Sequence, residues 1–261
     1  MMDSTPQKSA RLAVVALAFG LAMLGCGKDS SRHGKGPGSP STKNVAPGPY
    51  QIDLFKADPR EGTAVVILVD TSGSMRQSVS DRGGQKRPKN EIAKNALAQI
   101  LEHTNKWKKE HPQANLQMGI YNFSSLVNEV LPMGDFDETK AKAALNRIPL
   151  PNGGTAIGTA LEDAFKALYR SGCTRKFVVC ITDGENTAGP SPDWIARQLF
   201  ARTGAEVELH FVAFDTSAKQ FKFLSDVNGH VVEASDGDQL NAELTKIYEK
   251  RILVEKEEPE K

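Results

Sequence analysis

Two short runs of apolar residues constrain the fold of this chain more than any other feature. Ala64–Val69 and Phe177–Ile181 contain no charged or amide side chain. A continuous apolar run of this length is typical of a strand that is buried on both faces. The sequence therefore predicts a sheet covered by other elements on both of its sides.

The rest of the chain alternates between strand-like and helix-like patterns. Further strands are predicted over Leu116–Phe123, Leu126–Leu131, Val207–Phe214 and His230–Val232. Apolar side chains at helical spacing predict helices over Pro88–Lys109, Thr139–Ile148, Ile157–Tyr169, Trp194–Ala201, Phe221–Val227 and Leu240–Ile252. Because alternating strands and helices form crossover connections, we expect a doubly wound α/β fold with a mainly parallel sheet. The hairpin after Leu116 adds one antiparallel edge strand.

The N-terminal segment has the pattern of a secretory signal. Lys8 and Arg11 precede the apolar run Leu12–Leu24, which is too short to span a membrane. The run ends in Gly25 and Cys26, and this resembles the bacterial lipoprotein signal, in which the cysteine is lipidated and becomes the mature N-terminus. An ordinary cleaved signal with a bystander cysteine is the alternative. Gly27 rather than aspartate follows Cys26, and by resemblance to lipoprotein sorting in two-membrane bacteria this favours the outer membrane.

Composition divides the chain further. Residues 27–50 are rich in Gly, Ser, Pro and Lys, which predicts a flexible tether. We therefore expect a signal peptide at 1–25, a lipidated cysteine and tether at 26–60, one domain at 61–252 and a charged tail at 253–261. The net charge of +1 gives no reason to expect a nucleic-acid partner. The signal implies an extracytoplasmic protein anchored to a bacterial membrane.

Polar residues gather where the predicted strands end, which is where open α/β sheets bind ligands. Asp70-Thr71-Ser72-Gly73-Ser74 follows the first strand, and Thr182-Asp183-Gly184 follows the second apolar run. Asn152-Gly153-Gly154-Thr155 precedes a helix. Two carboxylates and three hydroxyls are hard oxygen ligands that suit Mg²⁺, Mn²⁺ or Ca²⁺. Zinc is disfavoured, because no histidine or cysteine joins them.

This set of motifs resembles the metal-ion-dependent adhesion site of von Willebrand factor A-type domains. The family pattern Asp-x-Ser-x-Ser, a distant threonine and a distant aspartate match Asp70, Ser72, Ser74, Thr155 and Asp183, and the likeness covers Gly62–Ile252. The resemblance implies that the serines contact the metal directly and that the threonine joins when a partner binds. It also implies that the aspartates act directly or through water, and that an acidic residue of a partner protein completes the shell.

Other interpretations of the same residues remain. A metal-dependent hydrolase of peptide or phosphate ester is the alternative function, although it needs a nucleophile and a positioned acid or base. Val69–Gly73 and Phe214–Ser217 are superficially similar to aspartic-protease loops, but glycine is missing after each threonine. A regulatory part of a cytosolic machine conflicts with the signal. We therefore expect a binding module and no enzyme.

Two smaller features complete the expectations. The loop Arg76–Lys89 carries five basic residues and forms either a collar that attracts an acidic partner or a solvated loop. Cys173 and Cys180 should not form a disulfide, because a strand would hold their α-carbons too far apart. By the family resemblance, the closing helix Leu240–Ile252 would shift when a partner binds.

Overall fold

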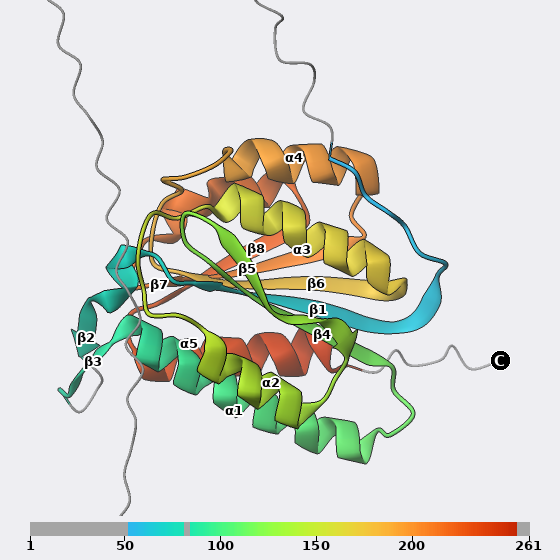
Figure 1. Ribbon diagram of the computed structural model, residues 1–261, viewed down its shortest axis with the longest axis horizontal. Helices are drawn as coiled ribbons and strands as arrows, with labels where there is room; N and C mark the ends of the chain where they lie inside the picture. The colour runs from blue at the N-terminus through green and yellow to red at the C-terminus, as the bar shows by residue number, and fades with distance from the viewer. Residues whose placement is uncertain (1–51, 81–83, 255–261) are drawn as a thin grey trace, which may run out of the picture. The chain divides into compact units, whose positions relative to one another are not determined.

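A six-stranded sheet forms the centre of the domain in the computed structural model, which describes residues 52–80 and 84–254 (Figure 1). The strands lie in the order β5-β4-β1-β6-β7-β8. Their bounds are Arg60–Asp70 (β1), Leu116–Phe123 (β4), Val127–Asp135 (β5), Cys173–Thr182 (β6), Val207–Phe214 (β7) and Gly229–Ala234 (β8). Only the β4–β5 pair within this sheet is antiparallel. The expected fold class, with one antiparallel edge strand, is confirmed.

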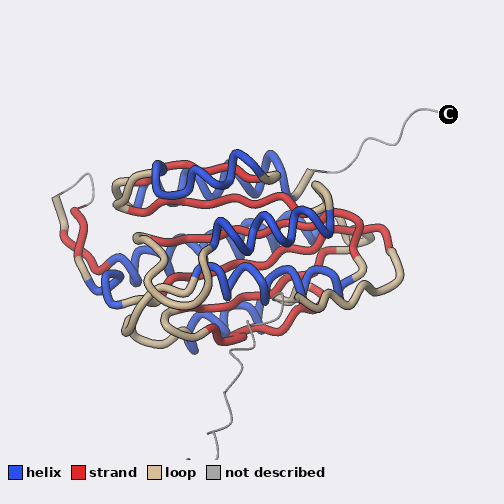
Figure 2. Tube along the Cα trace, turned by 90° about the horizontal axis from the view of Figure 1, so that it is seen from above, coloured by secondary structure: helices blue, strands red, loops and turns tan. Residues whose placement is uncertain are grey.

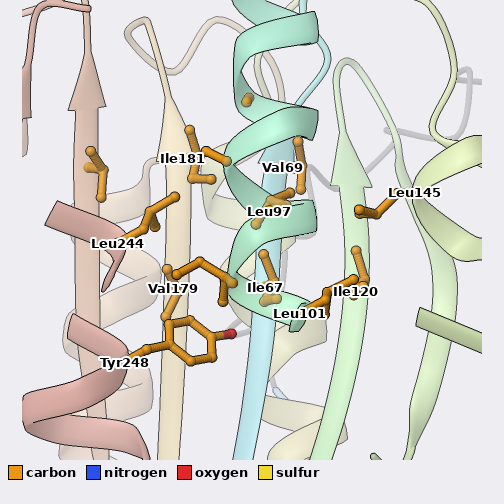
Figure 3. Close-up of a cluster of buried hydrophobic side chains, with 14 of the residues drawn as sticks. Ile67, Val69, Leu97, Leu101, Ile120, Leu145, Val179, Ile181, Leu244 and Tyr248 are labelled. Carbon is orange, nitrogen blue, oxygen red and sulfur yellow. The ribbon is translucent and has the colours of Figure 1, made fainter. Parts of the chain in front are cut away.

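Helices cover both faces of the sheet, as the apolar strands require (Figures 1 and 2). On one face lie α1 (Lys89–Glu110), α2 (Glu138–Arg147) and α5 (Gly237–Ile247). On the other lie α3 (Ile157–Ser171) and α4 (Pro192–Thr203). Alternate residues of β1 point to opposite faces, so Ile67 and Val69 pack beneath α1 while Val66 and Leu68 pack beneath α3. Figure 3 shows the first of these two cores, with Leu97, Leu244 and Tyr248 against the strands.

Short elements differ from the expectation. A small antiparallel hairpin, β2 (Ser78–Ser80) and β3 (Lys86–Pro88), occupies part of the loop expected to be a basic collar or a solvated segment. The helix expected over Phe221–Val227 is present as a 3-10 helix, η2 (Ala218–Asp226), and a short 3-10 helix that was not expected, η1 (Gly73–Arg76), follows β1. α5 ends at Ile247 and continues as a π-helical turn, η3 (Tyr248–Ile252). Strands of three residues and single helical turns are too short to leave a periodic pattern in sequence.

The packed part of the chain begins before residue 61, where we expected the domain to start. Ile52 is 1% exposed and lies in the core on the face covered by α3 and α4, and Arg202 of α4 donates a hydrogen bond to its carbonyl. The amide of Ala57 donates to the Tyr169 carbonyl at 3.2 Å. The last residues of the stretch expected as a tether are therefore part of the domain. Cys26, the signal segment and most of the charged tail lie outside the described residues.

Two further observations concern the described residues alone. Cys173 and Cys180 are both buried and both free, as expected. None of the helices described between residues 52 and 254 combines the length and the apolar character that crossing a membrane requires.

Candidate metal centre

Asp70 is the last residue of β1 and is fully buried, with 0% of its surface exposed. Its Oδ1 accepts a hydrogen bond from the Ser72 amide at 2.7 Å. Its Oδ2 accepts one from the Thr182 hydroxyl at 2.6 Å. The β1–β6 register pairs Val69 with Ile181, so Thr182 follows at the level of Asp70. Both carboxylate oxygens are thus oriented by the two strand ends.

A chain of oxygen atoms links the first loop to the end of β6. Ser72 Oγ lies 3.0 Å from Ser74 Oγ, and Ser74 Oγ donates to Asp183 Oδ1 at 2.7 Å. The 3-10 turn η1 makes this possible because it curls the chain back, with the Met75 amide bonded to the Ser72 carbonyl at 3.1 Å. Met75 is fully buried and anchors the turn in the core.

The loop that carries Thr155 is held beside the same edge by its backbone. The Asn152 amide donates to the Thr71 carbonyl at 2.8 Å, and the Gly73 amide donates to the Gly153 carbonyl at 3.0 Å. Gly153 adopts φ 78°, and a β-carbon there would lie 2.8 Å from Ser125 Oγ, so the position requires glycine. Thr155 is 4% exposed, and its amide bonds to the Thr187 hydroxyl at 2.8 Å.

The structure therefore joins four of the five expected residues in one series of contacts. Asp70 accepts from the Ser72 amide, the hydroxyls of Ser72 and Ser74 lie within hydrogen-bonding distance, and Ser74 donates to Asp183. Thr155 is placed next to them by its loop. Its hydroxyl makes no hydrogen bond to the other four within the described residues.

Sequence reasoning missed Lys89, which lies in the centre of this edge. Its Nζ is 2.9 Å from Asp183 Oδ2 and 2.8 Å from Asp215 Oδ2, and its side chain is 3% exposed. We expected Lys89 to belong to a basic collar or a solvated loop, and for this residue both expectations are wrong. Lys89 is the first residue of α1, and the burial of that helix start against the sheet edge carries the ammonium inward.

Asp215 and Thr182 lie in motifs noted in the sequence, but neither was among the expected site residues. Asp215 adds a third carboxylate to the two that we expected to cluster. It follows β7 in a left-handed conformation with φ 55°, and its amide bonds to the Ala234 carbonyl at 2.7 Å. Thr182 could have been found from sequence, because a polar residue that ends a buried strand beside β1 must lie next to Asp70.

The electrostatics of the edge follow from burial. Desolvation raises the pKa of Asp70 to about 6, opposed by the hydrogen bonds from Thr182 and Ser72 and increased by the charge on Asp183. No lysine, arginine or histidine forms an ion pair with Asp70 in residues 52–80 and 84–254. For Lys89, burial opposes the charge, but contacts with Asp215 and Asp183 outweigh it and raise its pKa.

These donors fit a hard divalent cation. Every polar side-chain atom of Asp70, Ser72, Ser74 and Asp183 is oxygen, the Asp70 carboxylate is buried without a cationic partner, and Oδ1 of Asp183 accepts from the Ser74 hydroxyl. Among the described residues, no group of three or more His, Cys, Asp or Glu side chains could hold a metal ion. A cation at this edge would therefore depend on the hydroxyls as well as on the carboxylates.

Comparison with known proteins agrees with the geometry. Residues 65–185 match the family model described as the von Willebrand factor type A domain. No curated protein sequence matches the chain.

Solved structures with the same fold share little sequence with the chain. The PilB minor pilin of Streptococcus sanguinis superposes with a TM-score of 0.59 at 13% identity, over 78% of this chain and 64% of the pilin chain. A von Willebrand factor type A protein of Catenulispora acidiphila gives 0.56 at 20% identity, over 72% of this chain and 42% of its own. Proximal thread matrix protein 1 from the mussel byssus, in a structure with a zinc-occupied metal-ion-dependent adhesion site, gives 0.53 at 20% identity, over 75% and 46%.

The chain thus spans less than two thirds of each of these three proteins. At these identities the likeness concerns the fold. Together with the sheet order and the helices on both faces, it shows that this chain contains a domain with the von Willebrand factor type A fold.

Proposed function

We propose that this chain is an extracytoplasmic, lipid-anchored binding module that captures a partner protein through a divalent metal ion shared with a carboxylate of the partner. The observation that carries the proposal is the hydrogen-bonded path at the ends of β1 and β6. It runs from the buried Asp70 carboxylate to the Ser72 amide, and from the Ser72 hydroxyl through that of Ser74 to Asp183. When bound, the cation would supply a coordination position for the partner's carboxylate oxygen. Mg²⁺ is the first candidate for the ion, with Mn²⁺ and Ca²⁺ next.

The residues of the path support binding more than catalysis. Ser72 and Ser74 supply neutral hydroxyls, and the Thr182 and Ser72 hydrogen bonds hold the Asp70 carboxylate in one orientation. The four described histidines are engaged elsewhere: His103 with Glu249, His111 with Trp107, and His210 and His230 with Glu208. No histidine among them is placed to act as a general base beside the serines.

Apolar side chains border the same edge and add a surface for a partner. Leu126 and Leu150 are 74% and 79% exposed. The turn before Leu126 is bonded to the Thr155 loop, because Ser125 Oγ accepts from the Gly154 amide at 2.8 Å. Arg76 is exposed beside them and donates to the Pro151 carbonyl at 2.6 Å. A partner segment with an acidic residue next to a large apolar one would complement these groups.

Metal binding is tested first, on the purified domain. Thermal unfolding is measured with EDTA and with Mg²⁺, Mn²⁺, Ca²⁺ or Zn²⁺. An ion at a hundredfold excess over Kd contributes about 2.7 kcal/mol, which corresponds to a Tm increase of roughly 5–10 °C for a domain of this size. We expect Ser72→Ala and Asp183→Ala to lose most of this increase. Ser78→Ala, an exposed serine on β2, is the matched control and should keep it. A wild-type Tm that changes neither with the added ions nor with the chelator would refute the metal site.

Partner capture is tested next. Wild type and Asp70→Ala are used to crosslink proteins on membranes of the source cell, with and without EDTA. We expect bands that disappear both with the chelator and in the variant. Equal capture in all arms would refute the shared-metal mechanism. Metal-dependent hydrolysis of a phosphate ester or a peptide that is lost in Asp70→Ala would instead support the hydrolase alternative.

A further inference from the structure

The ammonium of Lys89 contacts the second carboxylate oxygen of Asp183, which is one of the proposed metal ligands. Asp183 presents Oδ1 to Ser74 at 2.7 Å and Oδ2 to Lys89 at 2.9 Å. The Asp183 side chain is 0% exposed, so water does not screen either contact. The Asp183 carboxylate therefore interacts with the Ser74 hydroxyl through one oxygen and with the Lys89 ammonium through the other.

Lys89 is fixed in this place from three sides. Asp215 Oδ2 lies 2.8 Å from Nζ, and Gln77 Oε1 lies 3.5 Å away. The Lys89 amide also donates to the Gln77 carbonyl at 2.9 Å, which fixes the start of α1. The Asp215 side chain is 43% exposed and is therefore partly screened by water, while the Asp183 side chain is fully buried. The electrostatic interaction of Lys89 is therefore stronger with Asp183.

Stability alone is a poor reason for this arrangement. A buried ion pair gains little over apolar residues of similar volume, because the charges lose their hydration. An ammonium beside a ligand carboxylate has a specific electrostatic effect, since it repels any cation that approaches that carboxylate. It also compensates the buried charge of Asp183 when no cation is present.

We infer that Lys89 is a built-in counter-ion of the metal site: it neutralises Asp183 in the metal-free protein and weakens the hold of the site on a divalent cation. The inference rests on the proposed metal site and assigns Lys89 as a positioning residue that acts through Asp183. Binding would then be readily reversible, and the metal-free domain would stay folded.

The experiment compares Lys89→Met with wild type by calorimetric titration of Mn²⁺ and by thermal unfolding in EDTA. We expect Lys89→Met to bind Mn²⁺ about tenfold more tightly or better, since one positive charge beside the ligand is gone. We also expect its Tm in EDTA to fall, since Asp183 is left as an uncompensated buried charge. A purely structural role would lower both the Tm and the metal affinity, so the opposite signs separate the two roles.

Two variants act as controls. Lys94→Met removes the same charge from the same helix, but Lys94 bonds to the Ile148 carbonyl and touches no carboxylate of the site. It should leave the Mn²⁺ affinity unchanged. Lys89→Arg keeps the charge and should bind Mn²⁺ within about threefold of wild type.

Asp215→Asn provides a measurement if Lys89→Met does not fold. Asparagine tolerates the left-handed backbone at this position as aspartate does. Without the Asp215 charge, the positive charge of Lys89 is compensated by Asp183 alone and repels a cation at Asp183 more strongly. Mn²⁺ binding should therefore weaken about threefold or more. Unchanged affinity in this variant would overturn the inference.

The outcomes distinguish the inference from the proposed function. Wild type that binds Mn²⁺ while Lys89→Met binds it equally or more weakly refutes only the role of Lys89. Binding in Lys89→Met alone supports that role and refutes metal use by the native chain. Absence of binding in every variant refutes both.

Discussion

Single hydrogen bonds hold the Asp70 carboxylate in the orientation that the candidate site needs. Thr182 donates to Oδ2 at 2.6 Å, and this bond opposes the desolvation that raises the pKa of Asp70. Thr182→Val keeps the shape of the residue and removes the donor. We expect a loss of about 1.5–3 kcal/mol in the free energy of unfolding at pH 7, the usual range for a bond to a charged group. Urea denaturation in EDTA measures it.

The control for this variant lies on the same strand. Thr174→Val changes an exposed threonine near the start of β6, and its effect on the free energy of unfolding should stay within about 0.5 kcal/mol. Mn²⁺ affinity should fall in Thr182→Val and stay constant in Thr174→Val. Equal, small losses in both variants would show that Thr182 does not support Asp70.

At this scale, sequence predicted the residues that follow strand ends and missed those whose place depends on packing. Asp70 and Asp183 come directly after apolar runs, and parallel strands bring such positions to one edge. Lys89 sits in a stretch of basic residues, and nothing in its neighbours distinguishes it from them. Its burial follows from the place where α1 starts, which the hairpin β2–β3 determines.

Pairing of β7 with β8 places two histidines side by side, because the register sets His210 opposite His230. Their rings stack at 5.4 Å, and Glu208 Oε1 lies 3.0 Å from His210 Nε2. Burial lowers the pKa of His210 to about 4; Glu208 opposes this, while His230 and Arg251 add to it. The neutral ring is therefore the form that folding favours.

The sign of the pH dependence follows from this. Between pH 6.5 and about 4 the unfolded chain binds a proton on His210 that the folded chain does not, so stability falls as the pH falls through this window. We expect His210 to contribute about 2–3 kcal/mol to the loss. Urea denaturation in EDTA at pH 7 and pH 4.5 should show a smaller loss in His210→Gln than in wild type. His103→Gln changes a histidine whose side chain is 42% exposed and should retain the full loss.

Leu126 and Leu150 are exposed on two loops next to the candidate site. Substituting them tests the proposed partner-binding surface separately from metal binding. Leu126→Ser and Leu150→Ser should each weaken partner capture several-fold, because each removes apolar area from the interface. Mn²⁺ affinity and Tm should stay unchanged. Phe55→Ser removes a side chain that is 71% exposed in the segment before β1 and should leave capture intact. Loss of capture in all three variants would argue against a defined surface.

At the scale of elements, the apolar runs and the helical spacing predicted the sheet and its two helix layers. These predictions are confirmed because strands buried on both faces need long apolar runs, and helices that cover them need apolar residues at helical spacing. The hairpin β2–β3 was not predicted. The helices predicted over Phe221–Val227 and Leu240–Ile252 are present, but the first is the 3-10 helix η2 and the second ends in the π-helical turn η3. Each of them depends on tertiary packing, as when Tyr248 and Ile252 of the π-helical turn bury their side chains in the core.

The whole domain has two opposite ends along its strands, and the chain enters it at the end that lacks the candidate site. β1 runs from Arg60 to Asp70, and Ile52 accepts a hydrogen bond from Arg202 in the last turn of α4. The C-terminal end of α4 lies at the end of the sheet where β1 begins (Figure 1). The described chain therefore enters the domain at the end of the strands opposite Asp70.

Cys26 is the residue at which we expect the lipid anchor, and its substitution tests the prediction for the whole molecule. A single acyl chain binds membranes reversibly with an association constant of about 10⁴ M⁻¹, and several chains bind firmly. The native protein should sediment with membranes, and its mature N-terminus should be an acylated Cys26. Cys26→Ser should appear in the soluble fraction or as unprocessed precursor. Its Mn²⁺ affinity should equal that of wild type, because the candidate metal ligands lie far along the chain from Cys26, at Asp70 and beyond. A native protein that is soluble, with an unmodified N-terminus by mass spectrometry, would show that the segment is not a lipoprotein signal.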